Sequence, residues 1–431
     1  MKKIIVAVLI LANLLFMFGC GSKPSANNGS EKTDGENIEL TMWTFPFASD
    51  DKANEERANY DAMKKEFESQ NKGITLNIEI IPWANRETKM LTAIAAGKGP
   101  DIMYLNPDIL KLFVAYGVLA PIDDYITSDE LSSYSDTLLD NSVRLDGSLY
   151  GLPVLVDLGT PVYNLDLLKE IGMTEDTLPT TWDEYDKMLA ALKEKDIYGV
   201  YYNYCANGVI SGAYAQMFSE GCDVISSDGK VDVDSEAGLK VLNRLKSWYQ
   251  NGYTPKDSLS VQDDDSAFLS GKVASVFSPK DAGFFVRTAP DITFNWAAGP
   301  ILKGAAGQYG MSTVGSLGVS NNCKNVEAAA KFIKFFTEDE RNEAWCEYGG
   351  YICPKKGTEN PYKDLKGYSY ILQHLDCTRG EPNHAASRTM STVFIPDLQK
   401  IVSGDVEFNE GVTKLKTDME GIVKTIEALK N

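Results

Sequence analysis

Acidic side chains are the most numerous groups in this chain that could carry out chemistry. Two facing carboxylates could cleave a glycosidic bond, but among 61 Asp and Glu no local motif marks one pair. The run Asp263-Asp264-Asp265 suggests calcium but lacks the spaced oxygen ligands of a calcium loop, so we interpret it as the solvated start of a helix. G-x-S-x-G, H-E-x-x-H and P-loop motifs are absent from the sequence. We therefore predict no enzymatic activity and no cofactor.

Histidine and cysteine give little support for a metal site. Only two histidines occur, His374 and His384, and no C-x-x-C pair is present. Apart from Cys20, six cysteines could form disulfides in an exported chain, and the sequence does not determine their pairing. They are Cys205, Cys222, Cys323, Cys346, Cys353 and Cys377.

The elements that would position a site are strands alternating with helices. Apolar periodicity predicts strands over 38–45, 74–80 and 101–105, with a helix after each of the first two. This order indicates an α/β fold with a mainly parallel sheet covered on both faces. Later, Thr181 and Glu184 form a predicted capping box before a helix. Further predicted strands cover 197–202, 273–277 and 294–299, and the last third of the chain is predicted to be helical.

The N-terminus has the pattern of a secretory signal. Lys2 and Lys3 precede a run over residues 4–18 that is apolar except for Asn13, followed by Gly19 and Cys20. The run is shorter than the roughly 20 apolar residues that a membrane span needs. We predict that 1–19 is a signal peptide and that Cys20, in a position resembling the lipobox of bacterial lipoproteins, carries a lipid.

A polar segment follows the cysteine. Residues 21–37 contain a single apolar side chain, Ala26, and such a stretch cannot bury enough surface to offset its ordering entropy. We predict that residues 20–37 form the lipidated cysteine and a flexible tether, so that membrane contact comes from the lipid alone.

The length of the chain indicates how many lobes it forms, and its net charge limits the partners that it can bind. Single cores stop growing near 250–300 residues, so a chain of 431 residues is expected to form two lobes. The formal charge of −19 disfavours nucleic acid and anionic membrane surfaces as partners.

Five phrases resemble one family. They are GKGPDIMYL (97–105), DGSLYGLPVLVDLGTPVYNLDLL (146–168), LPTTWDEY (178–185), AFLSGKVASVF (267–277) and NVEAAAKFIKFFTEDE (325–340). In this order and spacing they resemble the bacterial extracellular solute-binding proteins of family 1, which include the maltose-binding protein of ABC importers.

The resemblance implies a periplasmic-binding-protein-like fold of type II. Two discontinuous α/β lobes would be joined by hinge strands, with the ligand in the cleft between them, where open α/β sheets commonly bind ligands. The implied lobes are 38–155 with 316–345, and 160–312 with 350–431. The hinges would lie near 155–160, 311–318 and 345–351, and closure would occur by hinge bending.

The resemblance also implies where a sugar would bind. Aromatic rings stack on the C–H face of a sugar, and carboxylates and amides bind its hydroxyls. Asp157, four residues after Pro153, corresponds to a sugar-contacting acid of the family, although a hinge-strand Asp bonded to backbone is the alternative. The other candidates follow predicted strands or lie late in the chain: Trp43, Phe45, Phe47, Trp83, Asn106, Asp108, Tyr202, Asn203, Tyr204, Phe284, His384 and Arg388. Trp43 could instead be core and Asp108 a helix cap, whereas Trp182 and Trp248 are expected in the core.

The function implied is that of a monomeric, lipid-anchored substrate-binding protein of an ABC importer. It would capture a sugar or oligosaccharide outside the cytoplasmic membrane and deliver it to a membrane permease. Alternatives are a binding protein for another solute such as a peptide or polyamine, a secreted glycoside hydrolase, and a surface sensor or adhesin.

Overall fold

A computed structural model describes residues 37–428 except 49–51, 85, 206 and 262–263. The predicted signal peptide, lipidated Cys20 and most of the tether therefore lie outside the described residues. Within the part described, no helix is long and apolar enough to cross a membrane. The six cysteines Cys205, Cys222, Cys323, Cys346, Cys353 and Cys377 are all free thiols.

The first sheet is built around three parallel strands. Strands β1 (Ile38–Thr44) and β2 (Ile74–Ile80) pair along their whole length, and β3 (Ile102–Leu105) pairs with the other side of β1. The long strand β11 (Gly310–Ser320) then runs antiparallel to β3 and to β7 (Leu152–Leu158). Two short strands, β4 (Leu119–Ala120) and β12 (Thr378–Arg379), also pair with β11.

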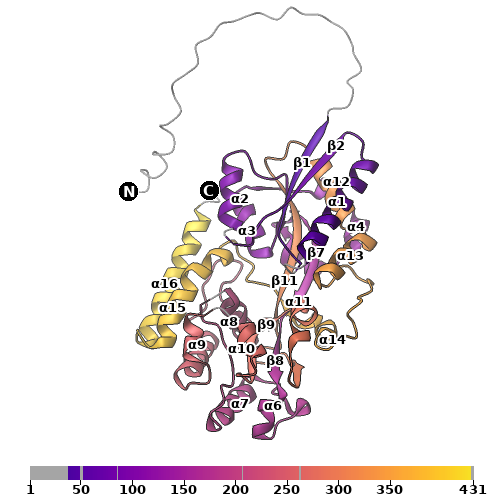
Figure 1. The fold of residues 1–431 in the computed structure, drawn as a ribbon. Coiled ribbons are helices and arrows are strands. Elements are labelled where there is room, and N and C mark those ends of the chain that lie inside the picture. The colour runs from indigo at the N-terminus through magenta and orange to yellow at the C-terminus, as the bar shows by residue number, and fades with distance from the viewer. Residues whose placement is uncertain (1–36, 49–51, 85, 206, 262–263, 429–431) are drawn as a thin grey trace, which may run out of the picture. The chain divides into compact units, whose positions relative to one another are not determined.

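Helices from distant parts of the sequence surround this sheet (Figure 1). Phe67 of α1 packs edge-on against Phe332 and Phe335 of α12, which joins the start of the chain to its last third. The elements are α1 (Ala53–Gln70), α2 (Arg86–Ala95), α3 (Pro107–Ala115), η2 (Asp123–Tyr125), α4 (Ser128–Ser132), α5 (Asp136–Ser142), the hairpin β5 (Arg144–Leu145) and β6 (Ser148–Leu149), α12 (Val326–Phe336) and α13 (Asp339–Gly349).

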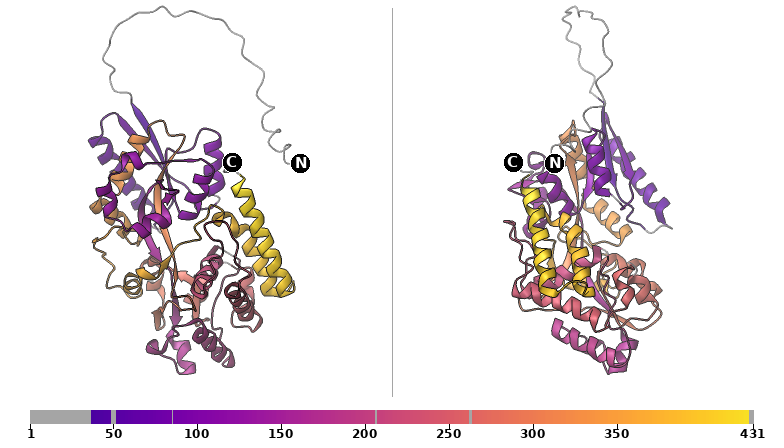
Figure 2. Two further views of the ribbon diagram at one scale, coloured as in Figure 1. Left: turned by 180° about the vertical axis from the view of Figure 1, so that it is seen from behind. Right: turned by 90° about the vertical axis from the view of Figure 1, so that its left-hand side faces the viewer.

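The second sheet has three antiparallel strands in the order β10 (Trp296–Ala298), β8 (Thr160–Asn164) and β9 (Ser275–Lys280). Helix α15 packs against α16, α9 and α8, and the yellow pair α15 and α16 lies side by side in Figures 1 and 2. The helical elements of this part are α6 (Leu165–Leu168), η3 (Lys169–Ile171), η4 (Glu175–Thr177), α7 (Trp182–Glu194), α8 (Asn207–Glu220), α9 (Glu236–Gln250), η5 (Lys256–Leu259), α10 (Asp264–Leu269), α11 (Ala282–Arg287), η6 (Ala289–Asp291), α14 (Tyr368–Gln373), η7 (Leu375–Cys377), α15 (Ser387–Ser403) and α16 (Phe408–Glu427).

Separate apolar cores under the two sheets define two α/β lobes, which confirms the predicted fold class. The core of the first lobe takes residues from 40–155 and again from 317–353, so this lobe is discontinuous in sequence. The largest core of the second lobe takes nearly all of its residues from 163–426. The chain passes from the first sheet to the second at Gly159, between β7 and β8. The exact lobe and hinge boundaries given above stay predictions.

Several elements agree with their predictions and two differ. The capping box of Thr181 and Glu184 is present, and Trp182 and Trp248 are buried. The predicted strand 197–202 is not a strand, because only isolated bridges connect Tyr198 and Tyr201 to the segment of β9. The prediction of a mainly parallel sheet is correct for β1, β2 and β3 but wrong for the second sheet, whose ladders are antiparallel.

Candidate functional site

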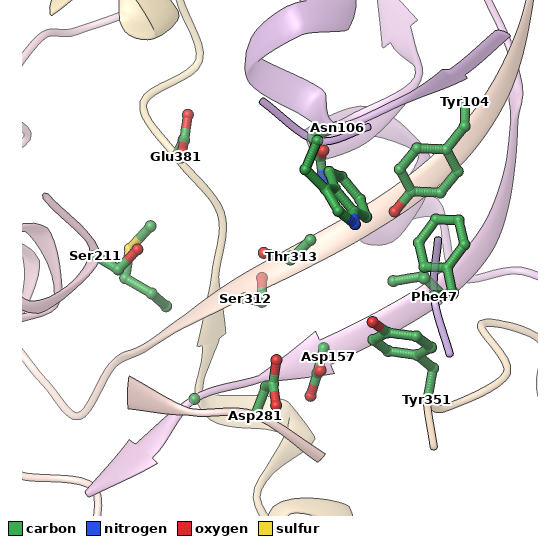
Figure 3. A pocket seen from close by; sticks show the side chains of 14 residues that line it. Phe47, Tyr104, Asn106, Asp157, Ser211, Asp281, Ser312, Thr313, Tyr351 and Glu381 are labelled. Carbon is green, nitrogen blue, oxygen red and sulfur yellow. The ribbon is translucent and has the colours of Figure 1, made fainter. Parts of the chain in front are cut away.

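A cavity of about 270 Å³ lies at the carboxyl ends of β1, β2 and β3. Its walls come from both lobes: Phe47, Trp83 and Asn106 follow the three first-lobe strands, whereas Ser211 and Asp281 belong to the second lobe. Figure 3 shows the side chains that surround this space. The carboxyl edge of an open α/β sheet is where such folds commonly bind ligands, so we take this cavity as the candidate site.

Aromatic side chains form one wall of the cavity. Phe47 contacts Tyr104 and Tyr351 edge-on, with ring centroids 4.8 Å and 5.8 Å apart. Trp83 is the most exposed of these rings, at 36%, and its indole N–H donates to the carbonyl of Pro46 at 2.8 Å. That hydrogen bond fixes one edge of the indole. Aromatic faces held in this way offer apolar contact to a ligand.

Two carboxylates also line the cavity and lie close to each other in Figure 3. Asp157 lies on β7, and its Oδ1 accepts hydrogen bonds from the backbone N–H groups of Leu158 and Ala282, both at 2.8 Å. Asp281 caps α11, where its Oδ1 accepts from the N–H of Phe284 at 2.7 Å. The N-terminus of α11 thus orients both carboxyl groups through its free N–H groups.

Burial controls the titration of Asp157. Loss of water raises its pKa well above the ordinary value, and the negative charge of Asp281 raises it further. The two backbone N–H groups and Arg287 act in the opposite direction but are the smaller causes. A ligand that brings hydrogen-bond donors or a positive charge would therefore stabilise the ionised form of Asp157.

Further polar side chains of the lining come from the start of α3 and from β11. Asn106 precedes Pro107 at the start of α3, and its side chain turns away from the helix to accept a hydrogen bond from Arg86 at 3.1 Å. Ser312 and Thr313 project from β11, where Thr313 is paired with Asp157. These side chains supply amide and hydroxyl groups that can both donate and accept hydrogen bonds.

Glu381 closes the cavity beside a cluster of charged groups. Burial raises the pKa of Glu381 to about 8, and the charge of Asp108 adds to this effect, while Lys111 and Arg388 oppose it. Lys111 is almost completely buried, and burial lowers the pKa of its ammonium to about 8. Since Arg388 also pairs with Asp108, this corner contains charges of both signs.

The structure brings four of the predicted site residues to the cavity: Phe47, Trp83, Asn106 and Asp157. Trp43 and Phe45 lie behind the wall, because both rings are buried in the first-lobe core. Phe45 still contributes by stacking under Trp83. In this structure Trp43 and Phe45 support the cavity wall, and ligand contact by either ring stays a prediction.

Asp108 and Arg388 lie beside the cavity and are bound to each other. Arg388 of α15 donates to Asp108 of α3 at 3.3 Å and to Glu87 of α2 at 2.9 Å. These ion pairs connect helices of the two lobes. The charged groups of Asp108 and Arg388 thus have protein partners in this structure, and ligand contact by them stays a prediction.

Tyr202, Asn203 and Tyr204 are buried and lie outside the cavity lining, and ligand contact by them stays a prediction. Tyr202 and Tyr204 face the second-lobe core, where the Tyr204 hydroxyl donates to the carbonyl of Leu245 at 2.8 Å. The side chain of Asn203 is also buried and accepts from the N–H of Cys205. The reason is that residues 197–202 form no strand whose end could present these side chains to the cavity.

Phe284 and His384 also lie outside the cavity lining. Phe284 is buried against Phe285, with ring centroids 5.3 Å apart. His384 is buried, and its Nδ1 accepts from the N–H of Ala386 at 3.1 Å. Each nevertheless lies within three residues of a side chain that does line the cavity, Asp281 and Glu381 respectively.

The sequence analysis missed several lining residues: Tyr104, Leu155, Gly159, Ser211, Asp281, Met311, Ser312, Thr313, Tyr351 and Glu381. Asp281 had a usable signal, because an Asp before an apolar segment is a common helix cap. Tyr351 had none, since it follows a helix end rather than a strand.

A two-lobed α/β fold whose cavity is lined from both lobes defines a binding protein of the periplasmic type II class. The chain belongs to the family of bacterial extracellular solute-binding proteins, whose family model matches residues 62–366. Membership in this family implies a location outside the cytoplasm. The family resemblance noted from the sequence is thereby confirmed.

Relatives and solved structures agree with this assignment. A binding protein of Brucella abortus is 30% identical over 301 residues, covering 68% of this chain and 72% of its own. The galactooligosaccharide-binding protein of Bacillus subtilis is 23% identical over 98% of both chains.

The fold is similar to an ABC substrate-binding protein of Listeria monocytogenes solved with cycloalternan. That comparison has a TM-score of 0.75 and 22% identity, and it covers 90% of this chain and 99% of the other. The comparison with the cyclic alpha-maltosyl-1,6-maltose binding protein of Arthrobacter globiformis has a TM-score of 0.76 and 19% identity. It covers 91% of this chain and 100% of the other.

Proposed function

We propose that this protein is the substrate-binding component of an ABC importer and captures an oligosaccharide in the cavity. The observation that carries the proposal is the pairing of an aromatic wall with opposing carboxyl and hydroxyl groups. A sugar ring has one apolar face and a rim of hydroxyls, so it needs both kinds of surface at once. Phe47 and Trp83 supply the first, and Asp157 with Thr313 supplies the second.

The names of the relatives support a carbohydrate. Besides the galactooligosaccharide-binding protein, they include an arabinooligosaccharide-binding protein of Bacillus subtilis and a maltotriose-binding protein of Pyrococcus abyssi. These proteins differ in the sugar that they are named for, so they favour the chemical class and not one particular glycan.

Capture would involve movement of the lobes. Because the cavity wall combines first-lobe and second-lobe residues, closing the lobes around a sugar would complete the contacts of Asp281 and Glu381 with it. The closed form would then be delivered to a membrane permease. Anchoring by a lipid on Cys20 would keep the protein at the outer face of the membrane, with the polar segment 20–37 as a tether.

A thermal-shift screen against a glycan panel tests the proposal. A ligand that binds only the folded state raises the melting temperature by mass action. We expect at least one oligosaccharide to do so, and we expect a smaller shift in Trp83→Ala, whose affinity should be several-fold weaker. The exposed variant Asp124→Asn, on η2 and outside the cavity lining, is the control and should keep the shift. A panel with no hit, in which peptides or polyamines bind instead, would overturn the carbohydrate proposal.

A further inference from the structure

Asp157 and Asp281 form an unusual pair inside the cavity. Asp157 is only 4% exposed, and in each carboxylate Oδ1 is bonded to backbone N–H groups of α11 or β7. For the second oxygen, Oδ2, the described part of the chain supplies no hydrogen-bond donor to either residue. Figure 3 shows both side chains directed into the same space. Two oxygens capable of accepting hydrogen bonds therefore remain for a ligand.

The charge around this pair is not neutralised. No Lys or Arg is among the residues that line the cavity. Arg287 is the cation whose charge acts on Asp157, but its guanidinium donates to the carbonyl of Gly349 and lies 5.6 Å from the ring of Tyr351. Lys280, which precedes Asp281 in the sequence, is already paired with Asp265. The charge of Arg287 is therefore shared by two carboxylates, which leaves one negative charge in excess when both are ionised.

The corner of the cavity around Glu381 has no such excess of negative charge. There, Glu381, Asp108 and Glu87 lie among three cations, Lys111, Arg86 and Arg388. That corner holds as many cationic as acidic side chains, and the raised pKa of Glu381 keeps it largely protonated at pH 6.5, so no negative charge is in excess there. The excess negative charge is therefore confined to the Asp157 and Asp281 side, and two carboxylates in a desolvated position repel each other unless a proton or a cation joins them.

The surroundings favour an organic cation over a metal ion. In the described part of the chain, no three His, Cys, Asp or Glu residues are close enough together to hold a metal. The facing wall consists of Phe47, Tyr351 and Trp83, and aromatic faces attract ammonium groups. A hydroxyl of Thr313 on the neighbouring strand adds a further acceptor.

We propose that the ligand is an amino sugar whose protonated amine lies between Asp157 and Asp281. This inference rests on the proposed function, since it specifies the carbohydrate. The sugar ring would lie against the aromatic wall, and the ammonium would donate to the two Oδ2 atoms. Charge-assisted hydrogen bonds are about twice as strong as neutral ones, so an amine should bind about tenfold tighter than a hydroxyl at the same position.

Calorimetric titration with matched sugars at pH 6.5 tests the proposal. The pairs are glucosamine with glucose, galactosamine with galactose, and the glucosamine trimer with its N-acetylated form. We expect the free amine to bind about tenfold tighter in at least one pair. Asp281→Asn keeps the helix cap but removes the charge, and it should reduce that preference to less than about threefold. Asp281→Ser, which also keeps a cap, is a second variant, and Asp124→Asn should keep the full preference.

The outcomes separate the two proposals. If neutral glycans bind and no amine is preferred, the amino-sugar inference fails while the proposed function stands. Preference for an amine that survives in both Asp281 variants also overturns the inference. If spermidine binds and no carbohydrate does, both the inference and the proposed function fail.

Discussion

Trp83 stacks on Phe45, with ring centroids 4.4 Å apart and 22° between the ring planes. The ring of Phe45 is buried, whereas the ring of Trp83 is exposed on the cavity side. The core of the first lobe thus supports an indole that is available to a ligand. The guanidinium of Arg86, 4.8 Å from the Trp83 ring, fixes the indole further.

Trp83→Ala should weaken oligosaccharide binding with little change in melting temperature. The variant removes an exposed ring, so it loses contact with the ligand but leaves no cavity in the core. Aromatic contacts contribute about 1 kcal/mol beyond area burial, so we expect a loss of at least several-fold in affinity. Calorimetric titration and unfolding of the same sample measure both quantities.

Trp182→Ala is the matched control for that experiment, because the same residue type here is 1% exposed and packs in the second-lobe core. Truncating a buried Trp costs roughly 3–5 kcal/mol of stability. We expect a clearly lower melting temperature and nearly normal binding by the folded fraction. The reverse pattern in the two variants would show that the cavity is not the binding surface.

Cys20→Ala should release the protein from the membrane without changing its melting temperature. The reason is that the lipid is proposed to be the only membrane contact. Detergent phase separation of cells expressing the variant measures the release. Cys377→Ala, which alters a cysteine of the folded body, should remain with the membrane. Retention of Cys20→Ala in the membrane fraction would refute the lipid anchor.

Lys111→Met should stabilise the folded protein at pH 7. Burial lowers the pKa of Lys111 from 10.5 to about 8, so between these values the folded state binds fewer protons than the unfolded state and stability rises with pH. Below pH 8 the full cost of the buried charge is present. The lowered pKa corresponds to roughly 3 kcal/mol of destabilisation by the buried ammonium at pH 7, and an apolar side chain of similar volume removes that cost.

The pH dependence of the stability difference between Lys111→Met and wild type shows whether the buried ammonium charge is its cause. The advantage of Lys111→Met should shrink as the pH rises from 8 toward 10, because the wild-type ammonium then loses its proton. Lys65→Met, on the exposed face of α1, should change stability little at any pH. A variant that is less stable than wild type at pH 7 would mean that the attraction of Lys111 to Glu381 and Asp108 outweighs its desolvation.

Ligand binding should reduce the radius of gyration in solution. Because both lobes contribute lining residues, hinge closure would bring Asp281 and Glu381 toward the aromatic wall. Small-angle scattering with and without a saturating oligosaccharide measures the change. An unchanged radius at saturation would contradict capture by closure.

The first-lobe side of the site could be predicted from sequence because local signals are strong there. Phe47, Trp83 and Asn106 each follow a strand whose apolar periodicity is clear, and parallel strands bring their carboxyl ends to one edge. Tyr104 was missed for the opposite reason: as part of a buried strand it had the pattern of a core residue, although one edge of its ring reaches the cavity.

The second-lobe side could not be predicted in the same way. Tyr202 and Tyr204 are in a segment rich in aromatic and amide groups, but tertiary packing against Trp248 and Leu245 turns them into the core. Asp281 was missed because β9 continues to Lys280, past the predicted end at 277. A strand predicted to that length would have placed Asp281 at a strand end, as a site candidate.

The central claim is that the cavity formed by Trp83 and Asp157 binds a carbohydrate. The most direct measurement is calorimetric titration of the best glycan from the thermal-shift panel into wild type and into the double variant Trp83→Ala, Asp157→Asn. Both residues line the cavity, and Asn can still accept the hydrogen bonds that hold Asp157. We predict saturable binding to wild type and none detectable to a folded double variant. Undiminished binding by the double variant would contradict the account.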